Sequence, residues 1–282
     1  MAGWLIAEDS KKPRIVSLTP NVTEIIVGLG ATDLLVGVSD YCSLPDGKAL
    51  PKCGGVMNAN FERILAQQPT HLLLLGRMEK VDRFAKEHGI RPVSVNVDSF
   101  ADLLREIRGI STLVDRQEAA DRMIRDLQAE LERVRSRSAT LPKYRCLISL
   151  GNEGGTLKRI MSVGGSSFLS EMLEVAGGSS LFPEQKQPYF AASLESVVAM
   201  QPEVIFDLRP GKSFDKEQIQ RIHEEWVAGA MFPAIRHNRV VMGTEGFLTT
   251  PGPKMVKIAE FFQTHLRRFA EKEREKAKGA NE

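Results

Sequence analysis

The sequence contains little cysteine, histidine or tryptophan, and this scarcity narrows the class of protein. Three cysteines, five histidines and two tryptophans occur among 282 residues. No CxxC pair or zinc-ligand spacing is present, and no two histidines stand at the spacing of metal ligands. A direct zinc or manganese receptor is therefore disfavoured. The histidines are interpreted as structural or surface residues: His71, His88, His223, His237 and His265.

Strong charge and long apolar runs are absent too. The net charge is +2 and no basic face is evident, so nothing points to a nucleic-acid partner. No apolar run approaches the about 20 residues that span a membrane. The apolar start, Met1 to Ala7, lacks a basic region and a full apolar core, so as written it is not a signal peptide. Either the protein is cytoplasmic or an export signal is missing from the sequence as given.

The few cysteines leave one question open. Cys42 and Cys53 flank a loop rich in proline and glycine, and a disulfide between them is one possibility in an oxidising compartment. Closing such a loop would stabilise the fold by about 3 kcal/mol in the chain-entropy view. Two free thiols are the equal alternative. Cys146 lies in a predicted strand and is interpreted as a small buried hydrophobe.

One pattern occurs twice. Residues 60–69 (NFERILAQQP) and 193–202 (SLESVVAMQP) each contain a capping residue, an acid two places later, an apolar pair, alanine and a final proline. Each copy then leads into an apolar stretch. A second pair of similar segments, at 23–30 and 170–177, occurs in the same order. Because solenoid repeats have periods of roughly 20–50 residues, these distant echoes predict two similar lobes instead.

The order of apolar segments favours an α/β protein. A hydrophobic fraction of 42% and a charged fraction of 26% are typical of a soluble globular chain, and the length suffices for two domains. Strands alternate with helices in the first part of the chain, which predicts a lobe with a parallel sheet. The predicted strands are residues 14–18, 34–38, 71–75 and 92–95.

A segment without proline separates the two repeats. Residues 99–138 contain one glycine, Gly109, and apolar residues recur there at helical spacing. Asp115 with Glu118 resembles a capping box and divides the segment into two helices. The second, about residues 116–137, would be about 33 Å long at 1.5 Å per residue. A long helix between lobes is a stiff connection, so we expect little hinge closure on ligand binding.

The second lobe is expected to repeat the α/β pattern. Strands are predicted at 144–150, 158–163 and 240–242, a glycine-rich turn at 151–156, a helix cap at Ser166-Ser167 and a closing helix at 255–269. We expect an N-terminal lobe (14–98), a helical segment (99–138), a C-terminal lobe (139–270) and a frayed charged tail (271–282). The ligand cleft is expected between two Rossmann-like lobes, at their strand ends.

Several short segments, taken in their order and spacing along the chain, resemble a known protein family. They are IVSLTP at 15–20 with Thr23-Glu24, VGVSDYC at 36–42, NFERILA at 60–66 with Pro69, GGSSFL at 164–169, AGG at 176–178, SLE at 193–195 and PGP at 251–253. Together they resemble the substrate-binding proteins of ABC importers with a rigid helical backbone. This class handles cobalamin, ferric siderophores and haem, and the similarity is greatest to the cobalamin-binding type. It extends from about Arg14 to Arg268.

The resemblance implies an exported monomer without an intrinsic cofactor, in the periplasm or alternatively as a cell-surface lipoprotein. Its function would be to capture cobalamin or a related corrinoid and deliver it to a permease dimer with a cytoplasmic ATPase. In this family one acid on each lobe docks into arginine pockets of the permease, and Glu62 and Glu195 match those positions. The alternative is that each acid merely suits a helix N-terminus, worth about 0.3–1 kcal/mol. That alternative does not explain why the acid stands at the same position in both copies of the repeated pattern.

Ligand contacts are expected on loops at the strand ends. Tyr41 and Tyr189 match aromatic positions of the cobalamin-binding relatives, and aromatic faces suit a planar ring such as a corrin. Ordinary loop packing is the alternative for both. Arg77 follows a strand and is a candidate for meeting a carboxylate or phosphate. Lesser candidates are Met57, Phe247 and Thr249.

Departures from the cobalamin pattern keep other ligands and classes open. Val56 and Gly76 stand where those relatives carry tryptophan. A siderophore receptor would often show more cationic residues, and a haem receptor would need an axial ligand such as Tyr41 or Tyr189. An enzyme is a further alternative, but residues 151–155 and 164–167 match neither GxGxxG nor GxxxxGK[ST]. No catalytic residues are assigned. The remaining alternative is a sensor module that has lost its importer.

Overall fold

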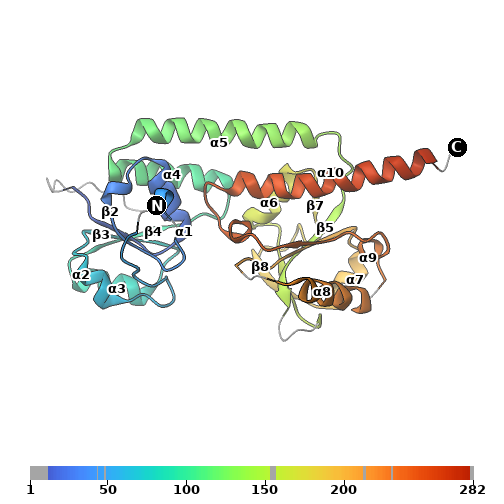
Figure 1. Ribbon diagram of the computed structural model, residues 1–282, viewed down its shortest axis with the longest axis horizontal. Helices are drawn as coiled ribbons and strands as arrows, with labels where there is room; N and C mark the ends of the chain where they lie inside the picture. Colours follow the sequence, from blue (N-terminus) through green and yellow to red (C-terminus); the bar gives the residue numbers. More distant parts are fainter. Residues whose placement is uncertain are drawn as a thin grey trace. The chain divides into compact units, whose positions relative to one another are not determined.

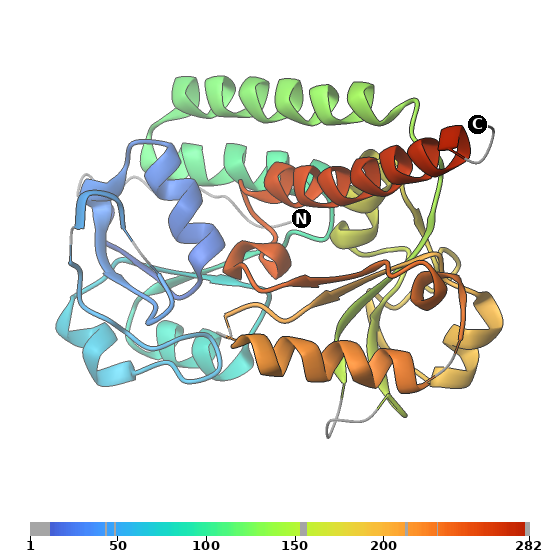
Figure 2. The ribbon, with the colours of Figure 1, turned by 45° about the vertical axis from the view of Figure 1, so that its right-hand side comes forward.

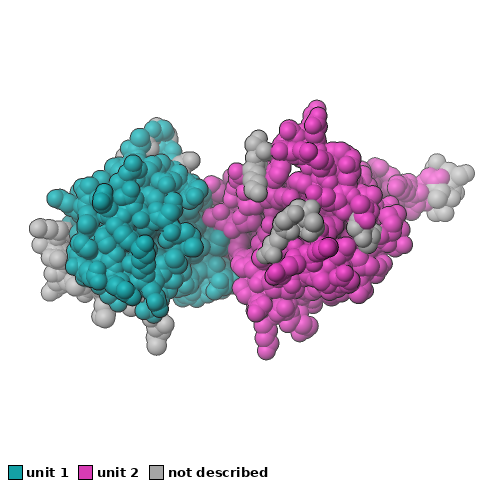
Figure 3. All heavy atoms as spheres, turned by 90° about the horizontal axis from the view of Figure 1, so that it is seen from below, with its two compact units in different colours: residues 1–128, 251–253 teal, residues 129–250, 254–282 magenta. Residues whose placement is uncertain are grey.

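The chain folds into two units. The structure, a computed structural model, describes residues 12–279 except 43, 48, 153–156, 212, 213 and 230. One unit contains residues 1–128 and 251–253, and the other contains residues 129–250 and 254–282 (Figure 3). The boundary falls inside helix α5 (Gln117–Ser138), so the predicted long helix contributes residues to both units.

The first unit is built on a four-stranded sheet in the order β2-β1-β3-β4, in which all neighbours are parallel. This confirms the predicted α/β lobe. Helices α2 and α3 lie on one face of the sheet and α1 and α4 on the other (Figure 1). The bounds are β1 (Ile15–Ser17), α1 (Pro20–Gly28), η1 (Thr32–Leu34), β2 (Leu35–Val38), η2 (Pro45–Gly47), α2 (Phe61–Ala66), β3 (His71–Leu75), α3 (Glu79–Glu87), β4 (Arg91–Val95) and α4 (Phe100–Val114).

The central strand β3 is apolar after its first residue, His71, because helices cover both faces of the sheet. Leu72, Leu73 and Leu74 are fully buried. Leu72 and Leu74 belong to one core cluster together with Val81 and Phe84 of α3. Continuous apolar runs of this kind are typical of strands in parallel sheets, whereas half-exposed strands alternate.

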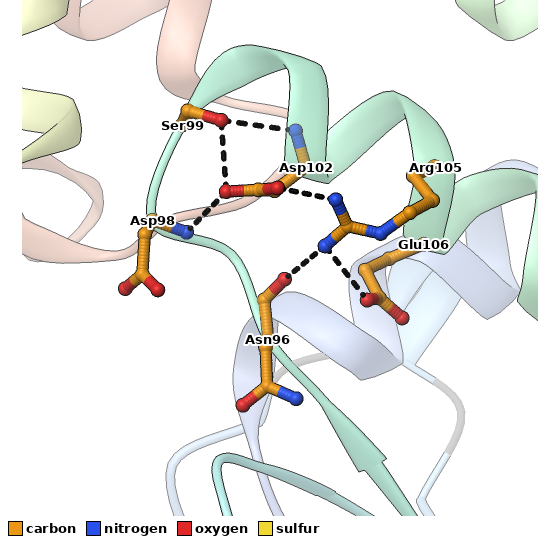
Figure 4. Close-up of polar contacts among 6 residues, drawn as sticks. All are labelled: Asn96, Asp98, Ser99, Asp102, Arg105 and Glu106. Carbon is orange, nitrogen blue, oxygen red and sulfur yellow. Dashed lines mark hydrogen bonds and ion pairs between the residues drawn. The ribbon is translucent and has the colours of Figure 1, made fainter. Parts of the chain in front are cut away.

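Helix α4 begins in a network of hydroxyl and charged groups (Figure 4). Ser99 Oγ accepts a hydrogen bond from the Asp102 backbone N–H at 3.1 Å and donates to Asp102 Oδ2 at 2.8 Å. Arg105 pairs with Asp102 and donates to Glu106 Oε1 at 3.3 Å and to the Asn96 carbonyl at 3.4 Å. Glu106 is almost completely buried, and this burial raises the pKa of its carboxyl group. The network fixes the start of the helix.

The two predicted helices between residues 99 and 138 are present as α4 and α5, but the predicted cap of the second is wrong. Asp115 adopts a left-handed conformation with φ 53° and ends α4. Helix α5 begins at Gln117. Aspartate reaches this conformation more readily than most residues, so it serves here as a helix end and not as a helix start.

The second unit contains a six-stranded mixed sheet in the order β10-β9-β5-β6-β8, with β7 also pairing with β5. Strands β7 and β9 pair with β5 in parallel, as β10 does with β9, whereas β6 pairs antiparallel with both of its neighbours, β5 and β8. The predicted mainly parallel sheet is therefore present, with an antiparallel extension. Its strands are β5 (Arg145–Asn152), β6 (Ile160–Val163), β7 (Ser179–Ser180), β8 (Tyr189–Ala192), β9 (Val204–Leu208) and β10 (Val240–Gly243).

Helices cover both faces of this sheet as well (Figure 2). In β9, Ile205 packs in a core cluster with Trp226, whereas Phe206 packs against Phe262 with ring centroids 4.7 Å apart. Successive residues thus serve opposite faces, as strand geometry requires. The helices are α6 (Phe168–Val175), α7 (Leu194–Met200), α8 (Lys216–Gly229), α9 (Pro233–Arg236), η4 (Gly246–Thr249) and α10 (Met255–Gly279).

Helix α10 is longer than the sequence predicts. It continues beyond the predicted end at residue 269 to Gly279, so residues 271–279 of the charged segment are helical. Glu273 accepts a hydrogen bond from the Tyr144 hydroxyl at 2.5 Å and pairs with the buried Arg239. These contacts hold the helical segment against the sheet. In the part of the chain described, no helix is both long enough and apolar enough to cross a lipid bilayer.

Two adjacent glycines in the second unit have a packing role. A side chain on Gly164 would lie 2.2 Å from the Gln187 carbonyl oxygen, and one on Gly165 would lie 2.0 Å from the Pro183 carbonyl oxygen. Only glycine lets the 183–187 backbone pass this closely. Ser167 caps α6 by accepting a hydrogen bond from the Leu169 backbone N–H, as predicted. Residues 153–156 of the predicted glycine-rich turn lie outside the described residues.

Candidate ligand-binding and docking residues

The repeated sequence pattern forms the same local structure in both units. Asn60 caps α2 by accepting a hydrogen bond from the Arg63 backbone N–H at 3.0 Å. Ser193 caps α7 in the same way, accepting from the Ser196 backbone N–H at 3.2 Å. Both copies end in a left-handed glutamine before the proline, Gln68 with φ 47° and Gln201 with φ 51°. The two segments are therefore structural equivalents.

Each of these helices presents its acid to solvent. Glu62 and Glu195 are exposed and lie in the first turns of α2 and α7. Hydrogen bonds from its own backbone N–H and from Ser193 lower the pKa of the Glu195 carboxyl. A carboxylate held at a helix N-terminus keeps its charge and a fixed direction, as docking onto an arginine would require. Permease docking itself stays a prediction for both residues.

Tyr41 lies on a turn that is fixed by hydrogen bonds to Lys52 and Gly54. The Asp40 backbone N–H donates to the Gly54 carbonyl at 3.1 Å, and the Gly54 N–H donates back to Asp40 Oδ1 at 3.2 Å. Lys52 Nζ donates to the Ser39 carbonyl at 3.2 Å and to the Cys42 carbonyl at 2.5 Å. The loop after β2 is thereby joined to residues 52–54, which fixes the backbone that carries Tyr41.

The Tyr41 ring is largely exposed at 74% and rests on a glycine. A side chain on Gly55 would lie 3.2 Å from Tyr41 Cε2 and 3.0 Å from Asn58 Oδ1. Met57, in the same turn, is 86% exposed. Two of the predicted ligand contacts therefore lie near Gly55, Tyr41 through its ring and Met57 two residues along the chain, and we call Tyr41, Gly55 and Met57 together the ledge. An exposed aromatic ring and an exposed flexible thioether are both side chains that suit a large planar ligand.

A buried group of hydroxyls and a thiol lies where β1 and β2 end. Thr23 Oγ1 donates to Ser17 Oγ at 2.8 Å and lies 3.1 Å from Cys42 Sγ. Ser39 Oγ lies 3.2 Å from the same sulfur. Cys42 is a buried free thiol, as are Cys53 and Cys146. Of the two alternatives for Cys42 and Cys53, the structure has free thiols, and Cys146 is buried in β5 as predicted.

Arg77 follows β3 and has most of its side chain in solvent. Its Nε donates to Asp82 Oδ2 at 3.2 Å, and 75% of the Arg77 side chain is exposed. The other Asp82 oxygen is buried and has no partner in the described part of the chain. Arg77 is therefore anchored through Nε, while most of its guanidinium group is exposed to solvent. Its role in binding an anionic ligand group stays a prediction.

The three candidates of the second unit lie on two different elements. Tyr189 begins β8 and is 43% exposed. Phe247 and Thr249 lie in η4, directly after β10, and both are partly buried. Val56 is half-buried against the core of the first unit, and Trp226 is fully buried in the second. The ligand roles of all these candidates stay predictions.

Sequence reasoning missed two features of these surfaces. Lys52 and Gly55 hold Tyr41 in place, yet a lone lysine and a lone glycine in a loop carry no recognisable signal. The second feature is the Asp207–Arg209 pair at the end of β9, in which Arg209 Nη2 lies 3.0 Å from Asp207 Oδ2. An aspartate inside an otherwise apolar strand was a signal for it, because buried charges need partners.

These observations define a two-unit α/β protein that carries the same acid-bearing helix in each unit. The chain belongs to the periplasmic binding protein family, which it matches over residues 15–245. The predicted resemblance to substrate-binding proteins is thereby confirmed.

The proteins that are similar to this chain include vitamin B12-binding and haem-binding proteins. The chain is 27% identical over 262 residues to the vitamin B12-binding protein of Vibrio parahaemolyticus, covering 90% of this chain and 91% of that protein. The solved periplasmic haem-binding protein HutB of Vibrio cholerae is 25% identical, with a TM-score of 0.75 over 91% of this chain and 99% of that one. The solved vitamin B12-binding protein BtuF of Vibrio cholerae shares the fold at 23% identity, with a TM-score of 0.72, covering 91% and 97%.

Proposed function

We propose that this protein is the substrate-binding component of an ABC importer and that it captures cobalamin or a related corrinoid. The observation that carries the proposal is the similarity to a vitamin B12-binding protein over 90% of the chain. The role assigned here is binding and delivery, with no catalytic step. The corrinoid is cargo, and no resident cofactor is proposed.

The local geometry supports the choice of a large planar ligand. The ledge of Tyr41, Gly55 and Met57 offers an exposed ring and an exposed thioether. Because hydrogen bonds from Lys52 and Gly54 already fix the turn, little ordering entropy is lost when a ligand binds there. Pre-formed sites of this kind are typical of small-molecule receptors.

Haem is the second candidate ligand, and specific observations favour it. A solved haem-binding protein is 25% identical to this chain. The Tyr41 side chain is 74% exposed, so its phenol oxygen is available as an axial ligand to iron. A ferric siderophore is a third possibility, for which the exposed Arg77 supplies a cationic side chain.

The proposal includes partners and a location. Delivery requires a permease dimer with a cytoplasmic ATPase, and Glu62 and Glu195 are proposed to dock there on permease arginines. Membership of the periplasmic binding protein family supports a place outside the cytoplasm. Within that space we propose a periplasmic monomer, with a lipid-anchored surface protein as the alternative.

Calorimetric titration of the purified protein with cyanocobalamin, haemin and a ferric siderophore tests the ligand. Tight one-to-one binding of cyanocobalamin, with weaker or no binding of the other two, is the expected result. Heat only with haemin or the siderophore would overturn the corrinoid assignment and leave the importer role in place.

The docking assignment has its own test. The double variant Glu62→Arg with Glu195→Arg should abolish ligand transport while leaving the ligand Kd unchanged. A matched control is Glu79→Arg with Glu217→Arg, because these exposed acids also lie in helix first turns. The control should transport normally. Equal transport by the two double variants would show that Glu62 and Glu195 are ordinary helix-start acids.

A further inference from the structure

The second unit contains a fully buried carboxylate that has no part in the function proposed above. Asp207 lies in β9 and has no exposed surface. Arg209, two residues later, donates from Nε to Asp207 Oδ1 at 3.1 Å and from Nη2 to Asp207 Oδ2 at 3.0 Å. The pair is thus bidentate, the geometry in which a guanidinium is held most firmly by a carboxylate.

Two further residues, Trp226 and Ser149, contact the Asp207 carboxylate. Trp226, itself fully buried, donates its indole N–H to Asp207 Oδ2 at 3.0 Å. Ser149 Oγ lies 3.5 Å from Asp207 Oδ1. With these bonds the orientation of Asp207 is fixed by the core, and Asp207 in turn fixes the guanidinium plane of Arg209.

Arg209 is the member of this group that reaches the surface. Its side chain is 15% exposed, whereas that of Asp207 is fully buried. Two of its five N–H groups bond Asp207, and in the described part of the chain the other three have no hydrogen-bond acceptor. A guanidinium in this state has donors left for a group that approaches from outside.

The position of Arg209 relates it to the predicted ligand contacts of the same unit. It follows β9 at the carboxyl edge of the parallel strands, the edge at which α/β proteins bind ligands. Its backbone N–H donates to the Gly243 carbonyl at 2.7 Å, and the Gly211 N–H donates to the Thr244 carbonyl at 3.2 Å. The segment therefore lies beside the end of β10, which leads into η4 with Phe247 and Thr249.

We propose that Arg209 is a ligand-binding residue that recognises an oxyanion of the cargo, either a phosphodiester or a carboxylate. The inference rests on the proposed function and names the chemical class of one ligand group. A buried ion pair is by itself a poor source of stability, because apolar residues of similar size often stabilise as well or better. The pair is better explained by recognition, since a pre-oriented guanidinium loses little entropy when an oxyanion binds.

The test compares two corrinoids that differ in the anionic group. Cobinamide has the corrin ring of cobalamin but lacks the phosphate-bearing nucleotide loop. For Arg209→Gln, the Kd of cyanocobalamin should rise roughly 10–100-fold, the loss expected for a charge-assisted hydrogen bond. The Kd of cobinamide should change by less than about twofold by the same reasoning, because its binding does not use this contact.

Arg145→Gln is the matched control, because Arg145 begins β5 in the same unit and lies near Glu203, with 3.8 Å between Nε and Oε2. It should leave both Kd values unchanged. If Arg209→Gln fails to fold, the double variant Asp207→Asn with Arg209→Gln removes the unpaired buried charge and is titrated instead. Equal losses for both corrinoids, or no loss for either, would show a structural ion pair only and overturn the proposal.

Failure of the proposed ligand is distinguishable from failure of this inference. If the wild type binds neither corrinoid, the corrinoid assignment is wrong, and haemin is compared with its dimethyl ester, which lacks the free carboxylates. A selective loss of haemin affinity in Arg209→Gln then supports oxyanion recognition through a carboxylate. Unchanged haemin affinity, equal losses for haemin and ester, or a wild type that binds no member of either pair overturns it.

Discussion

At the scale of single residues, His71 shows how burial changes the chemistry of a side chain. It begins β3, is almost fully buried and shares a hydrogen bond of 2.8 Å between Nδ1 and Thr70 Oγ1. Its Nε2 has no partner among the residues described. Burial, and then the charge of Arg91, lowers the pKa of His71 to about 4. This matches its interpretation as a structural histidine.

The low pKa of His71 predicts acid sensitivity. The folded-state pKa of about 4 lies below the ordinary value of 6.5, so protons bind preferentially to the unfolded state. The stabilisation by neutral His71 is complete above pH 6.5 and is lost as the pH falls toward 4. Between pH 7 and 5 the loss should be about 2 kcal/mol, since one pKa unit corresponds to about 1.4 kcal/mol. Urea unfolding of wild type and His71→Leu at both pH values measures it, and equal losses in the two proteins would contradict the assignment.

Gly55 offers a residue-scale test of the ledge. In Gly55→Ala the added methyl would lie 3.2 Å from Tyr41 Cε2 and 3.0 Å from Asn58 Oδ1, so the Tyr41 ring must move. Ligand affinity should fall about 3–10-fold, the magnitude of a weakened aromatic contact. Gly279→Ala is the control, because no atom lies within 4 Å of its added methyl group. Calorimetric Kd values for both variants decide, and an unchanged Kd in Gly55→Ala would count against Tyr41 as a ligand contact.

At the scale of elements, the length of α10 depends on contacts distant in sequence. The charged composition of residues 271–282 predicts fraying, yet the helix reaches Gly279. Glu273 provides the reason, since it pairs with Arg239 and accepts from Tyr144. Arg239 also lies over the Tyr144 ring at 4.9 Å. No local pattern in the sequence of α10 predicts that Glu273 contacts Arg239 and Tyr144.

Removing one carboxylate should therefore destabilise the second unit. In Glu273→Ala the buried Arg239 loses its ion-pair partner and Tyr144 loses its acceptor, so the free energy of unfolding should fall by about 2 kcal/mol. The control is Glu271→Ala, in which an exposed carboxylate 3.9 Å from Arg267 is lost. That change should stay within about 0.5 kcal/mol. Urea unfolding curves for both variants provide the measurement, and similar midpoints would refute the structural role of Glu273.

At the scale of the whole molecule, the repeated helix places one predicted docking acid on each unit. Glu62 belongs to the first unit and Glu195 to the second. The two acids have equivalent caps, helix positions and exposure, so neither is favoured as the dominant contact. Two docking contacts on one permease would reinforce each other. Once the first contact forms, the second acid is held near its own arginine at a high effective concentration.

Single charge reversals test this pairing. Glu62→Arg and Glu195→Arg should each slow transport, by about tenfold for the loss of one charge-assisted contact, and the double variant should be slower than either. Transport assays with reconstituted permease and ATPase measure the rates, with ligand Kd as the folding control. A normal rate in one single variant would mean that its acid does not dock.

The sequence by itself determined the elements and their duplication, because caps, prolines and apolar spacing act locally. Asn60 and Ser193 cap the helices that their positions predict. It also determined the family, which depends on the order of motifs along the chain. The tertiary structure alone decided which distant side chains meet: Lys52 with the turn of Tyr41, Glu273 with Arg239, and Asp207 with Trp226. These contacts join different elements of the fold, at separations of 10 to 34 residues along the chain, where burial and not local propensity selects the partner.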